Sequence, residues 1–139
     1  MTVSKLRLQA VPAPQQILVA YDDPSSQTLC RAADYAQALG AAIVVTNVAA
    51  EPDSDPEARR AARERLEEAR AYLQDRGLAA DFVPMVGPPA DAIVRLAEEK
   101  SVDLVVVGSR HKGFFERLVE GSVNEDVLRR AGCDVLVVY

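Results

Sequence analysis

The chain has 139 residues, of which 49% are hydrophobic and 27% are charged. This balance excludes wholesale disorder and fits one domain with a sizeable core. The formal net charge of −5 and the absence of tryptophan argue against a nucleic-acid partner. Two cysteines and one histidine are too few for a disulfide scaffold or a four-ligand zinc site.

We expect a cytoplasmic protein with no membrane partner. Apolar runs such as Leu104–Val107 and Val135–Val138 are far too short to span a bilayer. The first residues contain no apolar block of signal-peptide length. Residues 1–15 carry two prolines, and we predict that they form a flexible leader before a single domain over residues 16–139.

The first half of the domain alternates between strand and helix patterns. Ile17–Tyr21 is almost wholly apolar, which is typical of a buried parallel strand. A helical pattern follows, and Gly40 stands where a left-handed C-terminal cap is expected. Ile43–Val48 is rich in β-branched residues and is predicted to be the second strand. Pro56–Arg76 is strongly helical, with one apolar stripe and one charged face.

The second half continues the alternation. Ala80–Val86 is predicted to be a third strand, and Pro84 favours an edge position for it. Asp103–Val107 and Val135–Val138 are predicted to be the fourth and fifth strands, with helices between them. Strands that alternate with helices indicate right-handed crossovers and a parallel sheet covered on both faces, so the predicted fold class is α/β.

The candidate site lies where ligands of open parallel sheets bind, beyond the carboxyl ends of the strands. Gly108 follows the fourth strand, and Gly121 precedes Ser122 at a predicted helix start. Glycine lets backbone amides approach a ligand closely, and a helix N-terminus favours anions. Because Arg110 and Lys112 add positive charge nearby, the pattern points to phosphate binding.

Purely structural explanations stay open for the same residues. Ser122 and Glu125 form a capping box, which explains a helix start without any ligand. Gly108 also fits a simple turn at a strand end, and Asp22 fits a turn or cap before the first helix. Bare glycine spacings often match by chance.

Four stretches become informative when their order and spacing are read together. They are Ile17–Asp22, Gly87–Ala90, Asp103–Arg110, and Gly121–Val123 followed by Cys133–Val138. Together they resemble the universal stress protein family over roughly residues 16–138. The resemblance implies a single three-layer, Rossmann-like domain of the adenine nucleotide alpha hydrolase-like fold. Its five-stranded parallel sheet has the order 3-2-1-4-5, with helices on both faces.

The resemblance also implies partners and a ligand. Members usually form homodimers, in many cases through the last strand, and we expect an unidentified protein partner as well. Nucleotide-binding members hold ATP or AMP, often with a divalent metal such as Mg²⁺. In this chain the nucleotide would be a regulatory ligand in a stress response. Gly108, Gly121 and Ser122 match their motif at the correct spacing, whereas His111 replaces its second glycine.

His111 leaves two outcomes open. A side chain there strains a positive-φ backbone or occupies the volume of a phosphate. An imidazole can instead donate a hydrogen bond to phosphate. The first outcome favours a different function, a dimeric interaction protein of the same family that binds no nucleotide.

Carried over by position, the resemblance assigns the candidate residues to two ends of a nucleotide. Asp22 contacts the ribose or the adenine end, and Val48 supplies backbone contacts to adenine. The base end comprises Ala20, Tyr21, Asp22 and Val48. The phosphate end comprises Gly108, Arg110, His111, Lys112, Gly121, Ser122 and Val123.

An enzyme is the weaker alternative. Asp22-Asp23 resembles the acidic pair of receiver domains, but the further aspartate and lysine that such domains need are missing. Neither a Walker loop nor a Rossmann glycine fingerprint is present. We therefore expect no catalytic residue, no dedicated metal site, and at most slow ATP hydrolysis. Cys30 is predicted to lie in the core, and Cys133 to be buried beside the last strand.

Overall fold

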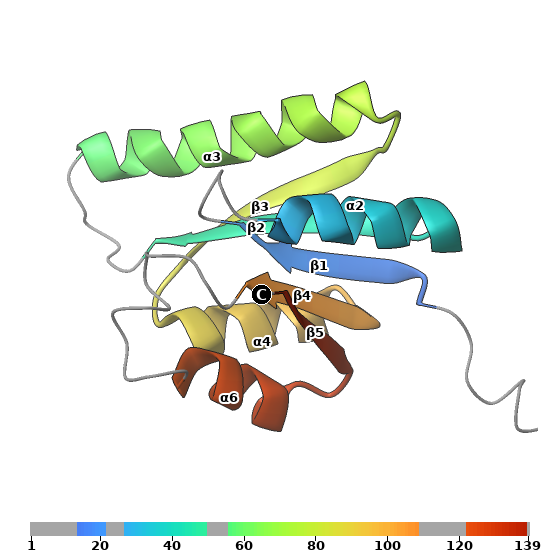
Figure 1. The fold of residues 1–139 in the computed structure, drawn as a ribbon. Helices are drawn as coiled ribbons and strands as arrows, with labels where there is room; N and C mark the ends of the chain where they lie inside the picture. The colour runs from blue at the N-terminus through green and yellow to red at the C-terminus, as the bar shows by residue number, and fades with distance from the viewer. Residues whose placement is uncertain (1–13, 22–26, 50–55, 109–121, 139) are drawn as a thin grey trace, which may run out of the picture.

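The computed structural model describes residues 14–21, 27–49, 56–108 and 122–138. Within them the chain alternates between strands and helices (Figure 1). The elements are β1 (Gln16–Ala20), α2 (Thr28–Leu39), β2 (Ala42–Ala49), α3 (Pro56–Asp75), β3 (Ala80–Val86), α4 (Pro89–Glu99), β4 (Leu104–Gly108), α6 (Ser122–Arg130) and β5 (Asp134–Val138).

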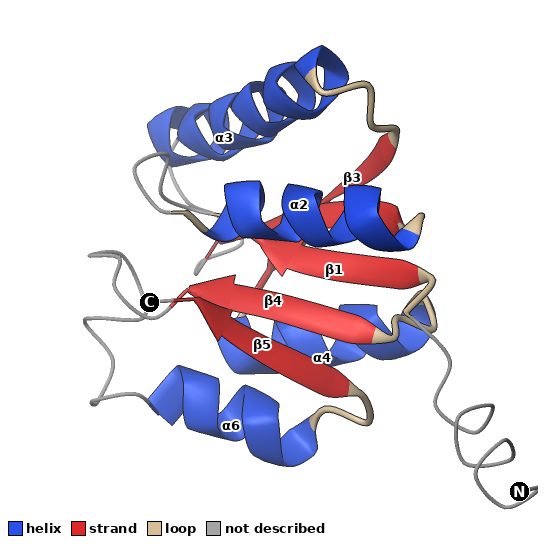
Figure 2. Cartoon of the chain, turned by 45° about the vertical axis from the view of Figure 1, so that its right-hand side comes forward, coloured by secondary structure: helices blue, strands red, loops and turns tan. Residues whose placement is uncertain are grey.

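The strands form one parallel sheet in the order β3-β2-β1-β4-β5. The register is continuous across its centre, where Leu18 of β1 pairs with Val44 of β2 and with Val105 of β4. Helices α2 and α3 cover one face of the sheet, and α4 and α6 cover the other (Figure 2). The predicted α/β class and the strand order 3-2-1-4-5 are therefore confirmed.

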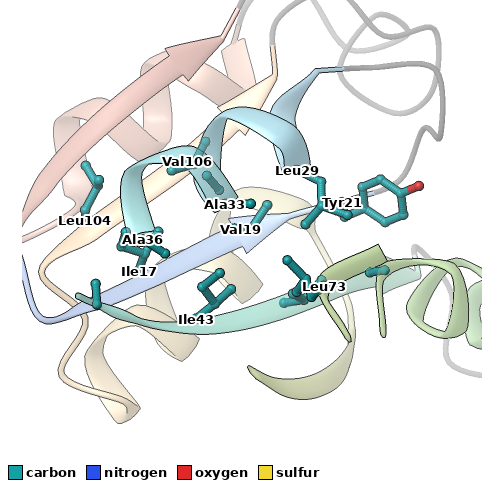
Figure 3. Close-up of a cluster of buried hydrophobic side chains, with 14 of the residues drawn as sticks. Ile17, Val19, Tyr21, Leu29, Ala33, Ala36, Ile43, Leu73, Leu104 and Val106 are labelled. Atoms are coloured by element: carbon teal, nitrogen blue, oxygen red, sulfur yellow. The ribbon is translucent and has the colours of Figure 1, made fainter. Parts of the chain in front are cut away.

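The core has two halves because successive residues of β1 point to opposite faces. Ile17 and Val19 pack under α2 and α3, where Ala33 and other small residues of α2 allow close approach (Figure 3). Leu18 packs on the opposite face, under α4 and α6. All three β1 side chains are fully buried. A strand covered on both faces needs an apolar residue at every position, which explains the unbroken apolar run in the sequence.

The strand β3 lies at one edge of the sheet, as Pro84 predicted. Directly after the strand, the N–H of Gly87 donates to the carbonyl of Ala49 at 2.9 Å. The backbone N–H and C=O groups of the odd-numbered residues of β3 therefore point towards β2. By alternation, the backbone groups of Phe82, Pro84 and Val86 point away from the sheet. Proline therefore occupies a position where its missing N–H breaks no hydrogen bond of the ladder.

The helices follow the expected patterns. Gly40 has a φ of 70°, which confirms the left-handed cap at the end of α2. The apolar stripe of α3 is buried at Leu66, Ala69 and Leu73. Among the helices that the structure describes, none is long and apolar enough to cross a membrane.

Replacing Leu73 tests the packing of α3 on the sheet. Leu73 is 1% exposed, and we expect Leu73→Ala to lower the free energy of unfolding by about 2–5 kcal/mol, because a cavity remains. The matched control is Leu39→Ala on α2, where the leucine is 40% exposed and the expected loss is within about 0.5 kcal/mol. Urea denaturation followed by circular dichroism measures both. Equal losses would contradict the assignment of the buried stripe.

Candidate functional site

The candidate site lies at the carboxyl edge of the sheet, between β1 and β4. From β1 the chain moves outward through β2 to β3, and it then crosses back to β4 on the other side of β1. The strand order reverses at this point, and the loops that leave β1 and β4 therefore diverge. In parallel α/β sheets such a switch point opens the crevice in which ligands bind.

Two residues predicted for the base end share one face of the sheet. Ala20 at the end of β1 and Val48 in β2 both belong to the core half under α4 and α6. They are 5% and 7% exposed, so the sheet is dry and apolar at this point on the face under α4 and α6. On the other side of the switch point, Gly108 ends β4, is buried, and pairs with Val138 of β5.

Tyr21 has its side chain on the opposite face. Its ring lies beside Leu29 at the end of β1 (Figure 3) and belongs to the core half under α2 and α3. The hydroxyl donates to Oε1 of Glu68 on α3 at 3.5 Å, and the backbone N–H donates to the carbonyl of Thr46 at 2.9 Å. The structure thus separates the ring of Tyr21 from the side chains of Ala20 and Val48.

Asn47 links the ends of β1 and β2. Its side-chain amide Nδ2 donates to the carbonyl oxygen of Tyr21 at 2.9 Å, and the residue is only 8% exposed. Buried hydrogen bonds of this kind hold a backbone segment in one position, because breaking them leaves polar atoms without water. Asn47 therefore positions the chain immediately before Asp22 and next to Val48. No role is assigned to Asn47 in the sequence analysis, although an amide within a mostly apolar strand was the available signal.

Helix α6 begins at residues that the sequence analysis predicts for the phosphate end. It begins at Ser122, and Val127 anchors it in the core under α4. Nη1 of Arg130 approaches Oδ1 of Asp91 on α4 at 2.7 Å, which ties the far end of the helix to its neighbour. An N-terminal turn attracts anions through its unpaired N–H groups and the helix dipole.

Several predicted residues lie outside the part of the chain that the structure describes. This applies to Asp22, Arg110, His111, Lys112 and Gly121. Ser122 and Val123 are placed by backbone at the start of α6, with no description of their side chains. The structure therefore locates Ala20, Tyr21, Val48 and Gly108 as whole residues.

The cysteines differ from the prediction. Cys30 is exposed, so its assignment to the core was wrong. One helical residue turns the side chain by about 100°, and Leu29 rather than Cys30 points to the sheet. Cys133 is half-buried, and this burial is the main cause of a raised pKa of its thiol. The negative charges of the Asp134 and Asp103 carboxylates raise the pKa further. Within the described segments, no three His, Cys, Asp or Glu side chains gather into a metal site.

The strand order and the switch point define the adenine nucleotide alpha hydrolase fold, a class of α/β domain. A model of the universal stress protein family matches residues 14–139. The chain belongs to the universal stress protein family. A universal stress protein of Thermus aquaticus is 35% identical over 134 residues, which cover 88% of this chain and 96% of that protein. The chain spans about half the length of other curated universal stress proteins that it matches.

Some similar solved structures are complexes with adenine nucleotides. A universal stress protein in complex with cAMP has a TM-score of 0.74 and 30% identity, over 91% of this chain and 98% of that chain. A universal stress protein of Archaeoglobus fulgidus in complex with dAMP has a TM-score of 0.72 over 90% of this chain and 97% of that chain. The second protein is 22% identical to this chain, so it shows the shared fold.

Replacing Asn47 tests its role at the carboxyl edge. We expect Asn47→Ala to lower the free energy of unfolding by about 1–3 kcal/mol, because a buried hydrogen bond is lost. Gln74→Ala is the control, since Gln74 carries an exposed amide on α3 and should change stability by less than about 0.5 kcal/mol. Thermal and urea unfolding measure both variants. An Asn47→Ala variant as stable as Gln74→Ala would contradict the role.

The raised pKa of Cys133 predicts a pH dependence. In Cys30→Ser protein, the midpoint of iodoacetamide alkylation of Cys133 should lie at higher pH than in the urea-unfolded chain. Because the folded state favours the neutral thiol, this group stabilises the fold below the unfolded pKa of the thiol. That contribution disappears as the pH rises through the folded pKa. An alkylation midpoint at or below the unfolded value would refute the prediction.

Proposed function

We propose that this chain is a universal stress protein that binds an adenine nucleotide, ATP or AMP, as a regulatory ligand. The complex of its 30%-identical relative with cAMP is the observation that carries the proposal. The geometry supports it, because Gly108 ends the buried β4 and Ser122 begins α6. The two residues flank the switch point at which nucleotides bind in open parallel sheets.

The base end of the nucleotide is assigned to the carboxyl ends of β1 and β2. Ala20 and Val48 offer an apolar wall on one face, and adenine is a flat and largely apolar group. Asp22 directly follows Tyr21 in the sequence, and the carbonyl oxygen of Tyr21 is fixed by a hydrogen bond from Asn47. A carboxylate in this position accepts hydrogen bonds from ribose hydroxyls.

The phosphate end is assigned by the family resemblance. Gly108 passes beneath the ribose and α-phosphate, and the N-terminal turn of α6 receives the outer phosphates. A divalent metal such as Mg²⁺ would neutralise part of their charge. The remaining residues of this end are Arg110, His111, Lys112, Gly121, Ser122 and Val123.

We further propose a homodimer that forms through β5. This strand is an edge of the sheet, and Val135, Leu136 and Val137 are only half-buried in the single chain. Pairing of two β5 strands would cover these apolar side chains and a sheet edge that otherwise invites aggregation. A cytoplasmic location and an unidentified protein partner stay predictions of the sequence.

A second candidate function is a dimeric interaction protein that binds no nucleotide. The observation that favours it is His111, which stands where nucleotide-binding members have the second glycine of their motif. If that backbone needs a positive φ, a side chain costs about 1 kcal/mol or more. Neither candidate function assigns a catalytic residue, and slow ATP hydrolysis would be a by-product of binding.

Calorimetric titration of nucleotide-stripped protein with Mg-ATP, AMP and cAMP separates the two candidates. We expect saturable binding of at least one of these ligands, and no binding of GTP. Gly108→Ala should weaken binding by about tenfold or more, because a methyl group intrudes where the backbone approaches the nucleotide. Gly132→Ala is the matched control, since an added Cβ at Gly132 meets no atom within 4 Å.

His111→Gly completes the experiment. If the unmodified chain is folded yet binds no adenine nucleotide, the proposal of nucleotide binding is wrong. Restored binding in His111→Gly would then show that the histidine closes an inherited site. If neither the unmodified chain nor His111→Gly binds an adenine nucleotide, the dimeric interaction protein is favoured. Capture of its partner would then be the next experiment.

A further inference from the structure

A groove with a volume of about 430 Å³ lies between α3 and the edge strand β3. We call it the α3–β3 groove. Helix α3 runs over this side of the sheet, away from β4 and β5 (Figure 1). The groove has an apolar floor and a charged rim. The floor is formed by Leu66 and Phe82, and the rim by Arg60, Arg63, Glu64, Glu67 and Arg70.

Arg70 is held over the floor of the groove. Its guanidinium carbon lies 4.3 Å from the centre of the Phe82 ring, a cation–π contact. Nε of Arg70 lies 3.5 Å from Oε2 of Glu67, and the Arg70 side chain is 44% exposed. A stacked guanidinium keeps its N–H donors in its own plane, so the edge that carries the two Nη atoms can receive a carboxylate.

Arg60 and Arg63 also have N–H donors that are available to a ligand. Among the described residues, no carboxylate lies within ion-pair distance of Arg63. Nη2 of Arg60 lies 3.4 Å from Oε2 of Glu57, and both side chains are more than half exposed. Exposed pairs of this kind contribute little free energy and exchange readily for a better partner.

The spacing of the cations indicates the size of the ligand. Arg60 and Arg70 are separated by about 15 Å along the helix axis, since each residue rises about 1.5 Å. One small anion cannot contact both ends, whereas about five residues of extended peptide cover the distance. Glu64 and Glu67 stand between the cations, so a matching peptide carries its carboxylates towards its ends. Its centre then faces Leu66 and Phe82 and is best apolar.

The sheet edge limits how such a peptide can bind. The outward backbone groups of β3 belong to Phe82, Pro84 and Val86, and Pro84 has no N–H. A strand added to this edge would lack its central hydrogen bond from β3. The contacts must therefore come mainly from side chains, through guanidinium–carboxylate pairs and burial of one apolar residue.

We propose that the α3–β3 groove docks an acidic peptide segment of a partner protein, with a central apolar side chain on Leu66 and Phe82 and flanking carboxylates on the arginines. This proposal goes beyond nucleotide binding and does not rest on it. It specifies the chemical character of the protein partner that the sequence analysis expects. The partner presents an acidic, exposed segment, although this chain is itself acidic, with a net charge of −5.

The test uses the full chain without nucleotide and a fluorescein-labelled heptapeptide that carries two acidic residues at each end and a leucine between two alanines at its centre. Fluorescence anisotropy measures the dissociation constant. We expect saturable binding that Arg63→Glu weakens by about tenfold or more, because one carboxylate contact becomes a repulsion. Arg59→Glu makes the same charge change at an exposed position of α3 that does not line the groove, and it should alter binding by no more than about twofold.

Two further peptides and one small molecule complete the test. A lysine version should not bind, and a version with serine in place of leucine should bind more weakly. Equal weakening by Arg63→Glu and Arg59→Glu would overturn the proposal, as it would indicate general attraction between charges. Absence of saturable binding, or equal binding of the serine version, would overturn it too. Displacement of the peptide by glutarate at equal concentration would reassign the groove to small dicarboxylates. Circular dichroism verifies that both variants are folded.

Discussion

The burial of β1 on both faces and along both edges is the constraint on which the rest of the structure depends. Its backbone groups are satisfied by β2 on one side and β4 on the other, and its side chains by two separate layers of helices. Asp103, just before β4, reinforces this arrangement at the opposite edge of the sheet. Its Oδ2 accepts hydrogen bonds from the N–H groups of Gln15 and Gln16 at 2.8 and 3.1 Å. Because β1 comes first in the chain and has later strands on both sides, the chain must cross back over it, and that crossing creates the switch point.

Because the sheet interior excludes water, the few polar groups at its carboxyl edge strongly affect the positions of the strand ends. Water cannot compete for the hydrogen bond between Asn47 and the carbonyl of Tyr21, so this bond fixes the relative position of the ends of β1 and β2. The hydroxyl of Thr46 makes a similar bond to the carbonyl of Val83 at 2.7 Å and links β2 to β3. A ligand bound at this edge would therefore meet strand ends that are already held in place. Such preorganisation lowers the entropy that binding must overcome.

The α/β class was predictable from sequence because the central strands are buried on both faces and read as unbroken apolar runs, whereas the strand order came from the family resemblance. Each predicted strand ends within one residue of the observed one, and Pro84 correctly placed β3 at an edge. Side-chain direction on a helix was less predictable, and Cys30 was assigned to the core although Leu29 takes the inward position. The role of Asn47 depends on a contact between two strands that no single stretch of sequence encodes. The effect of His111 on nucleotide binding depends on the backbone conformation at that position. The residue type alone does not determine that conformation.

The strand order also separates three surfaces that the protein could use together. The strand β5 lies at one edge of the sheet and β3 at the other, and the switch point between β1 and β4 lies between them. Adjacent strands are about 4.8 Å apart, so the two edges are separated by about 19 Å. A dimer formed through β5 would therefore leave the α3–β3 groove of each protomer open, and a peptide in that groove would not cover the carboxyl edge. Helix α3 contacts two of these regions. One of its residues, Glu68, accepts the hydroxyl of Tyr21 at the end of β1, and Arg63 and Arg70 of the same helix line the groove.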